Sequence, residues 1–260
     1  MNLRTAAEIS LLRDANQLVR AALDAVGAEI APGVTTGRLN AVAQAVLDAA
    51  GAEPLFVGQR MPGVALPFAA ATCVSVNEEI IHGVPGDREL REGDIVSVDC
   101  GARLAGWCGD SARTWPVGAV DAESRRLMDA TRSALDTAIA EMAPGRRWSE
   151  IARRMQAAVE RSGFGVVRDF GGHGVGRELH EPPHVPNYAD DVFRRRKSAP
   201  DFTLRPGLVI AVEPMVTAGT YRTVQSAPGE WPIVTRDRRR SAHFEHTVAV
   251  TDAGADVLSA

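Results

Sequence analysis

An internal repeat constrains the fold of this chain more than any other feature. The stretch LREGDIVSVD at residues 90–99 aligns with LRPGLVIAVE at residues 204–213. Both contain Leu-Arg-x-Gly-x, two branched apolar residues, a variable position, valine and a carboxylate. Self-similarity of this kind indicates a chain built from related units, although a chance match between two strands is the alternative.

The helical patterns repeat as well. Apolar residues step by three and four positions within residues 12–26 and again within residues 128–142, as they do on the buried face of a helix. Each run ends at the same Ala-Pro-Gly sequence, at residues 31–33 and 143–145, where proline and glycine terminate a helix. The matching offset of these two stops makes a chance repeat the poorer explanation.

A second helical pattern follows each stop and closes at Gly51 in one half and at Gly163 in the other. The order is therefore helix, helix, strands, given twice. We expect an α+β fold in which residues 1–260 form a single catalytic domain of two related halves, about 1–118 and 119–260. A pseudo-twofold axis between the halves would place the carboxylates that end the two repeated strands in equivalent positions.

Composition excludes several classes of protein. The three cysteines, Cys73, Cys100 and Cys108, form no even disulfide framework, which fits a reducing compartment. No apolar run of about 18 residues is long enough to span a bilayer. A formal net charge of −4 argues against a chain built mainly to coat nucleic acid. We expect a cytoplasmic protein with no membrane partner, and a monomer because no long apolar seam is left over.

Two aspartates lie on either side of a predicted hairpin. Asp99 ends one strand pattern and Asp110 follows after RLAG. Pairing that is symmetric about Leu104–Ala105 would place the two carboxylates directly opposite one another, with Cβ atoms about 4.5–5.5 Å apart. That spacing suits a pair of metal ions, and a surface cluster with Arg103 and Arg113 is the alternative.

The histidines gather in three short stretches, each near a glycine or an acidic residue. Glu245 lies within an alternating strand pattern, HFEHTVAVT, where a buried glutamate needs a partner. Oxygen-rich ligands with an imidazole suit Mn, Fe(II) or Co(II) better than a structural zinc site. The six histidines are His82, His173, His180, His184, His243 and His246, and the four carboxylates are Asp99, Asp110, Glu213 and Glu245.

The chain closely resembles the type I methionine aminopeptidases of bacteria, in peptidase family M24. The similarity extends over nearly the whole length and rests on motifs in a fixed order. These are SVNEEIIHGVPG at 75–86, VSVDCG at 96–101, GDSART at 109–114, GHGVGRELHEPPHVPNY at 172–188, AVEPMV at 211–216 and SAHFEHT at 241–247.

The resemblance implies a pita-bread fold, an antiparallel sheet with helices on one face and internal pseudo-twofold symmetry. It implies that the N-terminal methionine is removed from nascent polypeptides with a small second residue, by a hydroxide that bridges two divalent metal ions (Co, Mn or Fe(II)). Asp99 would bind one ion, Asp110 and Glu245 both ions, and His173 and Glu213 the other ion.

The same resemblance implies roles around the substrate. His82 would lie near the scissile bond, His180 at the substrate carbonyl, and Glu213 would handle the proton of the attacking water. The methionine pocket would include Phe68, Cys73, Leu179 and Trp231.

The sequence departs from the family pattern in places. Phe68 and Ala65 stand where relatives often have tyrosines, and Leu179 where many have phenylalanine or methionine, so the pocket should remain apolar but differ in shape. For Phe68, a merely structural apolar loop is an equal alternative. His243 stands where glutamine is common, and we expect it to preserve a hydrogen bond rather than to perturb the pKa of Glu245.

Two basic clusters, Arg194–Lys197 and Arg238–Arg240, are solvated surface or a contact with ribosomal RNA, since cationic clusters bind phosphate.

Two other functions compete with methionine aminopeptidase activity. An Xaa-Pro peptidase of the same superfamily would share the fold and metals, but such enzymes usually carry an extra N-terminal domain. A non-catalytic binding relative would normally lack metal ligands, whereas all five are present here.

Overall fold

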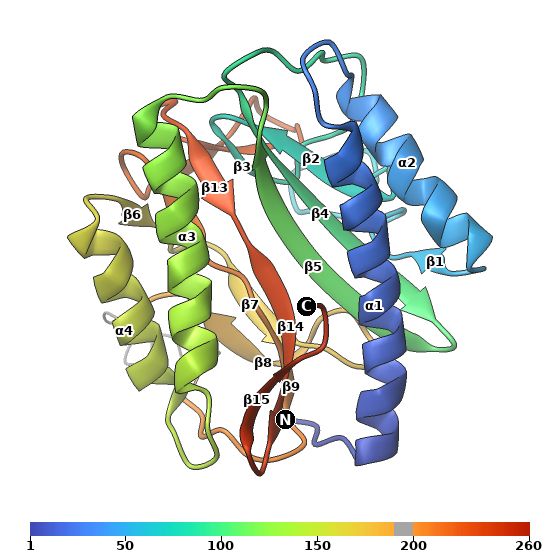
Figure 1. Cartoon of the computed structure of the whole chain (residues 1–260), viewed down its shortest axis with the longest axis vertical. Helices are drawn as coiled ribbons and strands as arrows, with labels where there is room; N and C mark the ends of the chain where they lie inside the picture. Colours follow the sequence, from blue (N-terminus) through green and yellow to red (C-terminus); the bar gives the residue numbers. More distant parts are fainter. Residues whose placement is uncertain (190–199) are drawn as a thin grey trace.

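The computed structural model describes residues 1–189 and 200–260 and contains the two helix pairs predicted from the apolar periodicity. The first pair follows the N-terminus, and the second begins after the first set of strands. Both pairs lie on the same face of a curled sheet (Figure 1). The helices are α1 Ala6–Glu29, α2 Thr36–Ala49, α3 Ala122–Glu141 and α4 Trp148–Arg161.

Antiparallel strands make up most of the remainder. Seven strands of the main sheet follow the order β1-β4-β5-β14-β9-β7-β8, with β2 added on β4 and β15 on β14. Two small sheets have the orders β13-β10-β6 and β11-β12-β3. The strands are β1 Glu53–Pro54, β2 Thr72–Val76, β3 Glu79–Ile81, β4 Ile95–Leu104, β5 Trp107–Pro116, β6 Gly165–Val166, β7 Gly171–Gly174, β8 Glu181–Pro186, β9 Val209–Val212, β10 Met215–Thr217, β11 Thr223–Gln225, β12 Ile233–Thr235, β13 Ser241–His243, β14 Glu245–Thr251 and β15 Gly254–Val257.

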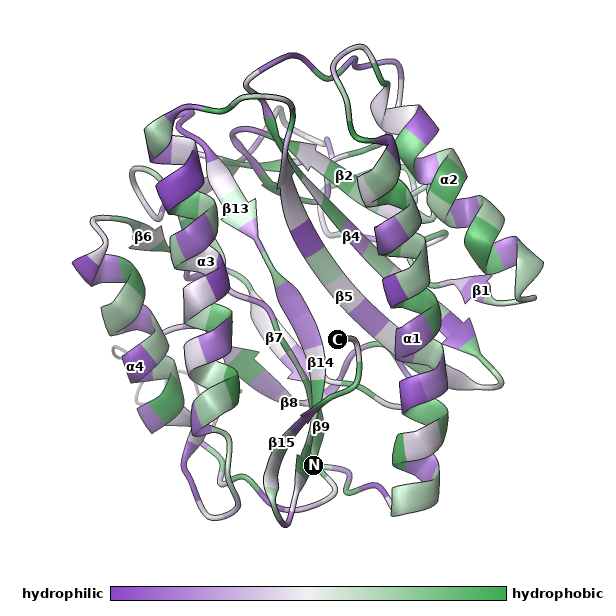
Figure 2. Ribbon diagram, in the orientation of Figure 1, coloured by the Kyte–Doolittle hydropathy of each residue, from purple (hydrophilic) through white to green (hydrophobic). Residues whose placement is uncertain are grey.

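Three of the four helices, α1, α2 and α3, begin at a residue whose side chain caps the helix. Thr5 caps α1 by accepting a hydrogen bond from the backbone N–H of Glu8, whose carboxylate bonds back to Thr5, forming a capping box. Asp121 caps α3 in a similar way by accepting from Ser124. Polar and apolar residues alternate along the helices (Figure 2), as expected for helices with one face against a sheet.

Each helix pair covers its own hydrophobic core. Residues of α1 and α2, such as Val19 and Leu39, pack with Val98 of β4. Residues of α3 and α4, such as Leu135 and Ile151, pack with strands that include β9 and β14. The structure thus confirms the α+β class with helices on one sheet face, and within the described ranges no helix is long and apolar enough to cross a membrane.

The β4–β5 register corrects one prediction. Asp99 pairs with Ala112 and Asp110 with Gly101, so the two aspartates are not directly opposite but diagonal neighbours. The hairpin turns at Ala105–Gly106, one residue later than expected. Both residues have positive φ, 50° and 80°, as a two-residue type I′ turn requires, and glycine adopts this conformation readily.

Strand alternation separates the core from the acidic residues. Val96, Val98 and Cys100 of β4 are fully buried in the core beneath α1 and α2. Successive side chains of a strand point to opposite faces, so Asp99 points away from the helices. Asp110, opposite Gly101, shares that face. The carboxylates are therefore held on the side of the sheet that the helices leave uncovered.

Candidate metal centre

A cavity of about 410 Å³ lies on this side of the sheet. It brings together side chains from strands far apart in the sequence, such as β4 and β5 on the one hand and β7 and β14 on the other. Ten of the eleven residues proposed from the sequence line it: Phe68, Cys73, His82, Asp99, Asp110, His173, His180, Glu213, Trp231 and Glu245.

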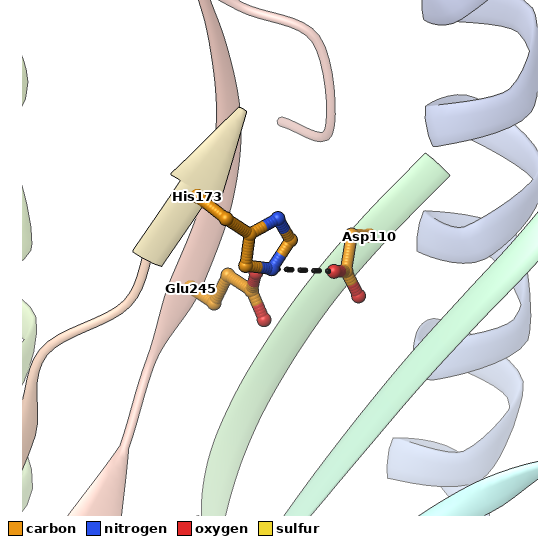
Figure 3. Close-up of side chains that lie close together, drawn as sticks. All are labelled: Asp110, His173 and Glu245. Carbon is orange, nitrogen blue, oxygen red and sulfur yellow. Dashed lines mark ion pairs between the residues drawn. The ribbon is translucent and has the colours of Figure 1, made fainter. Parts of the chain in front are cut away.

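Asp110, His173 and Glu245 form the tightest group, with one ligand atom from each residue within 4.8 Å of the others. They come from three strands, β5, β7 and β14, and converge on one point (Figure 3). His173 Nε2 lies 3.5 Å from Asp110 Oδ2 and 3.9 Å from Glu213 Oε1. This arrangement can hold a divalent ion.

The backbone orients the His173 ring. Its Nδ1 lies 3.1 Å from the carbonyl oxygen of Gly174. A hydrogen bond from Nδ1–H to that oxygen leaves Nε2 with a free lone pair directed at the carboxylates. Metal-binding histidines are commonly fixed in this way, with the second ring nitrogen donating to a carbonyl.

Several buried polar atoms of the cavity have no hydrogen-bond partner within the described residues. They include Oδ1 of Asp99, Oδ1 of Asp110 and Oε1 of Glu245. A buried acceptor without a donor is costly, and buried carboxylates are normally paired or coordinate metals. The donor set therefore fits divalent metal ions, which would satisfy these oxygens and compensate their charge.

The electrostatics support the same interpretation. Burial raises the pKa of Asp99 to about 7, while nearby His243 lowers this pKa and Glu213 raises it by a smaller amount. The pKa values of Asp110 and Glu245 also lie well above their ordinary values, because both groups are buried and face other carboxylates. Like charges at this spacing resist ionisation unless a cation lies between them.

Glu213 behaves differently from these three carboxylates. Burial alone would raise its pKa, but His243, His173 and His180 bring it below the ordinary value. His243 Nε2 lies 3.6 Å from Glu213 Oε2, and its side chain is only 2% exposed. His243 thus faces Glu213. The charges that raise the pKa of Glu245 are those of Asp110, Glu213 and Asp99, so a direct effect of His243 on Glu245 gains no support.

His82 and His180 approach the cavity from different segments. Burial lowers the pKa of His82 to about 4. Burial against the cavity wall, together with the charge of His173, also lowers the pKa of His180 to about 4, although that residue as a whole stays open to solvent. The His180 ring lies 4.3 Å from the His173 ring, measured between centroids. Both His82 and His180 are therefore neutral near pH 7 and can each donate one N–H.

The expected methionine pocket is apolar. Phe68 meets Trp231 edge to face at 5.1 Å, and His82 lies 6.0 Å from the same indole. Trp231 Nε1 donates to the carbonyl of Leu66, which ties the loop before Cys73 to the cavity wall. Leu179 is the exception among the proposed residues, since it is buried in the core cluster that also contains Phe68 and does not line the cavity.

Other lining residues were missed from the sequence, among them Gln59, Arg60, Met61, Asp169 and Phe170. Asp169 and Phe170 directly precede the GGHG motif, and this adjacency could have pointed to them. Residues 59–61 had no such signal, because only the folded loop, closed by a Phe68 N–H bond to the Gln59 carbonyl, brings them to the cavity.

The surface ion-pair alternative for the two aspartates is wrong. Asp110 is only 4% exposed. Arg113 pairs with Asp24 of α1, and Arg103 pairs with Glu53 and Glu178. Both arginines bind other carboxylates, so within the described part of the chain the aspartates lack the cation that the alternative requires.

The fold and the site together define a metallopeptidase with a pita-bread fold. Residues 10–252 match the model of metallopeptidase family M24, and the chain belongs to this family. It is 40% identical over 256 residues to methionine aminopeptidase 1 of Bacillus subtilis, covering 98% of each chain. This similarity confirms the resemblance drawn from the motifs.

Solved structures agree with this assignment. Methionine aminopeptidase from Rickettsia prowazekii superposes with a TM-score of 0.91 at 33% identity, covering 100% of both chains. The enzyme from Thermotoga maritima superposes with a TM-score of 0.90 at 40% identity, covering 100% of this chain and 99% of the other.

Proposed function

We propose that this protein is an aminopeptidase that removes the N-terminal methionine from polypeptides with a small second residue. The convergence of Asp110, His173 and Glu245 in a buried cavity carries the proposal. Relatives about 40% identical over nearly the whole chain are named methionine aminopeptidases, which favours this substrate over Xaa-Pro peptides.

Two divalent ions fit the proposed ligand set. Asp99 would hold one ion, His173 and Glu213 the other, and Asp110 and Glu245 would bridge both. Four carboxylates match the charge of two divalent cations, which explains why the pKa of three of them is raised without cations. When bound, such ions lower the pKa of water and polarise a peptide carbonyl. Mn, Fe(II) and Co(II) are the candidates.

The chain's own groups supply the remaining chemistry. Glu213, whose pKa is lowered, is ionised near pH 7 and can accept a proton from the attacking water. Neutral His180 can donate its N–H to the carbonyl oxygen as negative charge develops there. His82, on the side of Trp231 and Phe170, would orient the substrate backbone next to the scissile bond.

The side chain of the substrate methionine would pack against the apolar wall of the cavity. Phe68, Cys73 and Trp231 line the cavity beside the metal-binding residues. A thioether makes favourable contacts with aromatic rings about 5 Å from the sulfur. This wall supports Phe68 as a pocket residue rather than only a structural one. Leu179 would act indirectly, through the buried apolar cluster that also contains Phe68 and Cys73.

The cellular setting belongs to the same proposal. Substrates would be the N-termini of nascent polypeptides in the cytoplasm, and the enzyme would act as a monomer. A ribosome contact would depend mainly on Arg194–Lys197, which lies outside the described residues. In the other cluster, Arg239 and Arg240 already pair with Glu123 and Asp121, leaving less free charge for phosphate. Salt-sensitive cosedimentation with ribosomes would support the contact, and none at low salt would exclude it.

Release of methionine from Met-Ala-Ser tests the function. Metal-stripped protein should be inactive and should regain activity on titration with Mn(II), Fe(II) or Co(II). The Asp110→Asn variant should lose at least about 100-fold in kcat/KM, since a bridging ligand is removed. Asp256→Asn, which alters a surface carboxylate paired with Arg13, is the matched control and should match wild type. Cleavage of Xaa-Pro peptides but not of Met-Ala-Ser would contradict the proposal.

A further inference from the structure

The short segment that carries His180 is attached to the N-terminal segment through one carboxylate. Glu181, the residue after His180, accepts hydrogen bonds from the backbone N–H groups of Arg177 and Glu178, at 3.0 and 3.3 Å. A single side chain therefore closes the turn that precedes His180. The other oxygen of Glu181 faces the start of the chain.

That second oxygen is held by the N-terminal segment. Glu181 Oε2 accepts from Asn2 Nδ2 at 2.7 Å and forms an ion pair with Arg4. The pair is well shielded, with the Arg4 and Glu181 side chains 12% and 10% exposed. Burial would raise the pKa of Glu181, but these donors and the charge of Arg4 hold it below the ordinary value.

Arg4 is itself fixed in place. Its backbone N–H donates to the carbonyl of Gly207 at 2.7 Å. Its guanidinium lies 5.4 Å from the ring centroid of Trp107, and that of Arg177 lies 4.4 Å from the same ring. A guanidinium within about 6 Å of an indole centroid is attracted to the ring face, which favours this placement of Arg4.

A glycine makes room for the pair. A Cβ added to Gly176 would lie 2.0 Å from Arg4 Nη2 and 2.3 Å from Glu181 Oε1. Gly176 does not adopt a left-handed φ, so the requirement is for space rather than for backbone conformation. This accounts for one glycine of the GHGVG motif that neither the cavity nor the metal ligands explain.

We propose that the Arg4–Glu181 ion pair, packed against Gly176 and Trp107, is a positioning device that sets the His180 side chain over the substrate carbonyl. The inference rests on the proposed function only for the role of His180 as a hydrogen-bond donor to the substrate carbonyl. The orientation of His180 itself is a property of the metal-free chain. Small displacements of a group that stabilises the transition state lower kcat strongly, so the device should affect turnover.

Three variants separate positioning from metal binding. In Arg4→Met, Glu181→Gln and Gly176→Ala, kcat for Met-Ala-Ser should fall at least about tenfold, while KM and the Mn(II) affinity measured by calorimetry stay within about twofold. Arg4→Lys should restore most of the activity, because it keeps the charge. Arg13→Met, which breaks a separate ion pair between α1 and Asp256 of β15, is the matched control and should leave kcat unchanged.

Histidine side-chain NMR of the metal-free protein gives a readout independent of activity. The His180 ring resonances should move in Arg4→Met and return in Arg4→Lys, while those of His246, bonded to Ser259 away from the cavity, stay in place. Unmoved His180 resonances, or a parallel loss of metal affinity, would overturn the positioning role. Absence of turnover in the wild type, with the NMR shifts present, would count against the proposed function alone.

Discussion

At the residue scale, His243 shows how one side chain can adjust a metal site without being a ligand in the proposed set. Its Nε2 faces Glu213 at 3.6 Å from the interior of the protein. Its backbone is fixed by Thr114, whose hydroxyl contacts both the N–H and the carbonyl of His243. A partner of this kind orients a ligating carboxylate, and removing such partners typically weakens metal affinity about 10–100-fold.

His243 variants test this orientation. His243→Leu should weaken Mn(II) binding at the Glu213 side about tenfold or more, since the carboxylate loses the imidazole that faces it. His243→Gln should stay within about threefold of wild type, because the amide supplies a donor. The control is His246→Gln, because His246 follows Glu245 in β14 but does not line the cavity. Calorimetric titration of apo protein measures all three, and equal affinities in Leu and Gln variants would contradict the orienting role.

Asp99 gives a pH-dependent prediction. Its folded pKa is raised to about 7, so the folded state binds a proton that the unfolded state releases from about pH 4 upward. The titration of Asp99 should therefore lower the stability of the metal-free protein as pH rises from about 4 to 7. His82 and His180, with lowered pKa values, act in the opposite direction, so the comparison must isolate Asp99.

The Asp99→Asn variant provides that comparison. In EDTA, its Tm relative to wild type should rise between pH 5 and pH 8 by about 5 °C. Mn(II) should reverse the order at pH 8, since the carboxylate then has a cation. Differential scanning fluorimetry at several pH values measures the difference. A Tm difference independent of pH would mean that Asp99 titrates normally in the folded chain.

At the element scale, the β4–β5 hairpin decides where both aspartates lie. Its turn places Ala105 at φ 50°, a left-handed conformation that alanine adopts at some expense. The following Gly106 completes the type I′ pattern. The turn thus fixes the register by which Asp99 and Asp110 become diagonal neighbours on the cavity face.

Ala105→Asn should stabilise this hairpin by about 0.5–1 kcal/mol, since Asn-Gly is the preferred type I′ pair. Urea unfolding at one pH would show an increased midpoint with an unchanged slope. Metal affinity should not change, because the register stays the same. A lower midpoint would argue against the type I′ geometry. Ala253→Asn serves as the comparison, because it lies in a different turn, between β14 and β15, and not in the β4–β5 hairpin.

At the scale of the whole molecule, two hydrophobic cores lie beneath two helix pairs, while the cavity takes residues from both halves. One continuous sheet joins them through β5, β14 and β9. Trp115 packs against the core of α1 and α2, and Trp148 is fully buried in the core of α3 and α4. Each of these indoles can report on its own half once the other tryptophans of the chain are replaced.

Unfolding should be a single transition if the chain is one domain, because the sheet couples the halves. Two variants should each keep one indole, Trp115 or Trp148, with the other three tryptophans replaced by phenylalanine. Their urea titrations by fluorescence and by far-UV circular dichroism should show coincident midpoints within each variant. Leu39→Ala and Leu135→Ala should each lower the stability of the whole chain by about 2–5 kcal/mol. Separate transitions would show that residues about 1–118 and 119–260 fold independently.

The sequence by itself determined the helices, their stops and the candidate ligands. Apolar periodicity and Ala-Pro-Gly punctuation are local signals, so α1 to α4 were predicted closely, and alternation in HFEHTVAVT correctly predicted a buried Glu245 in a strand. Only the tertiary structure decided the β4–β5 register, the contact of His243 with Glu213, and the approach of Arg60 and Met61 to the cavity. Those features depend on which φ values a turn adopts and on which distant segments pack together, and neither is encoded in the spacing of residues along the chain.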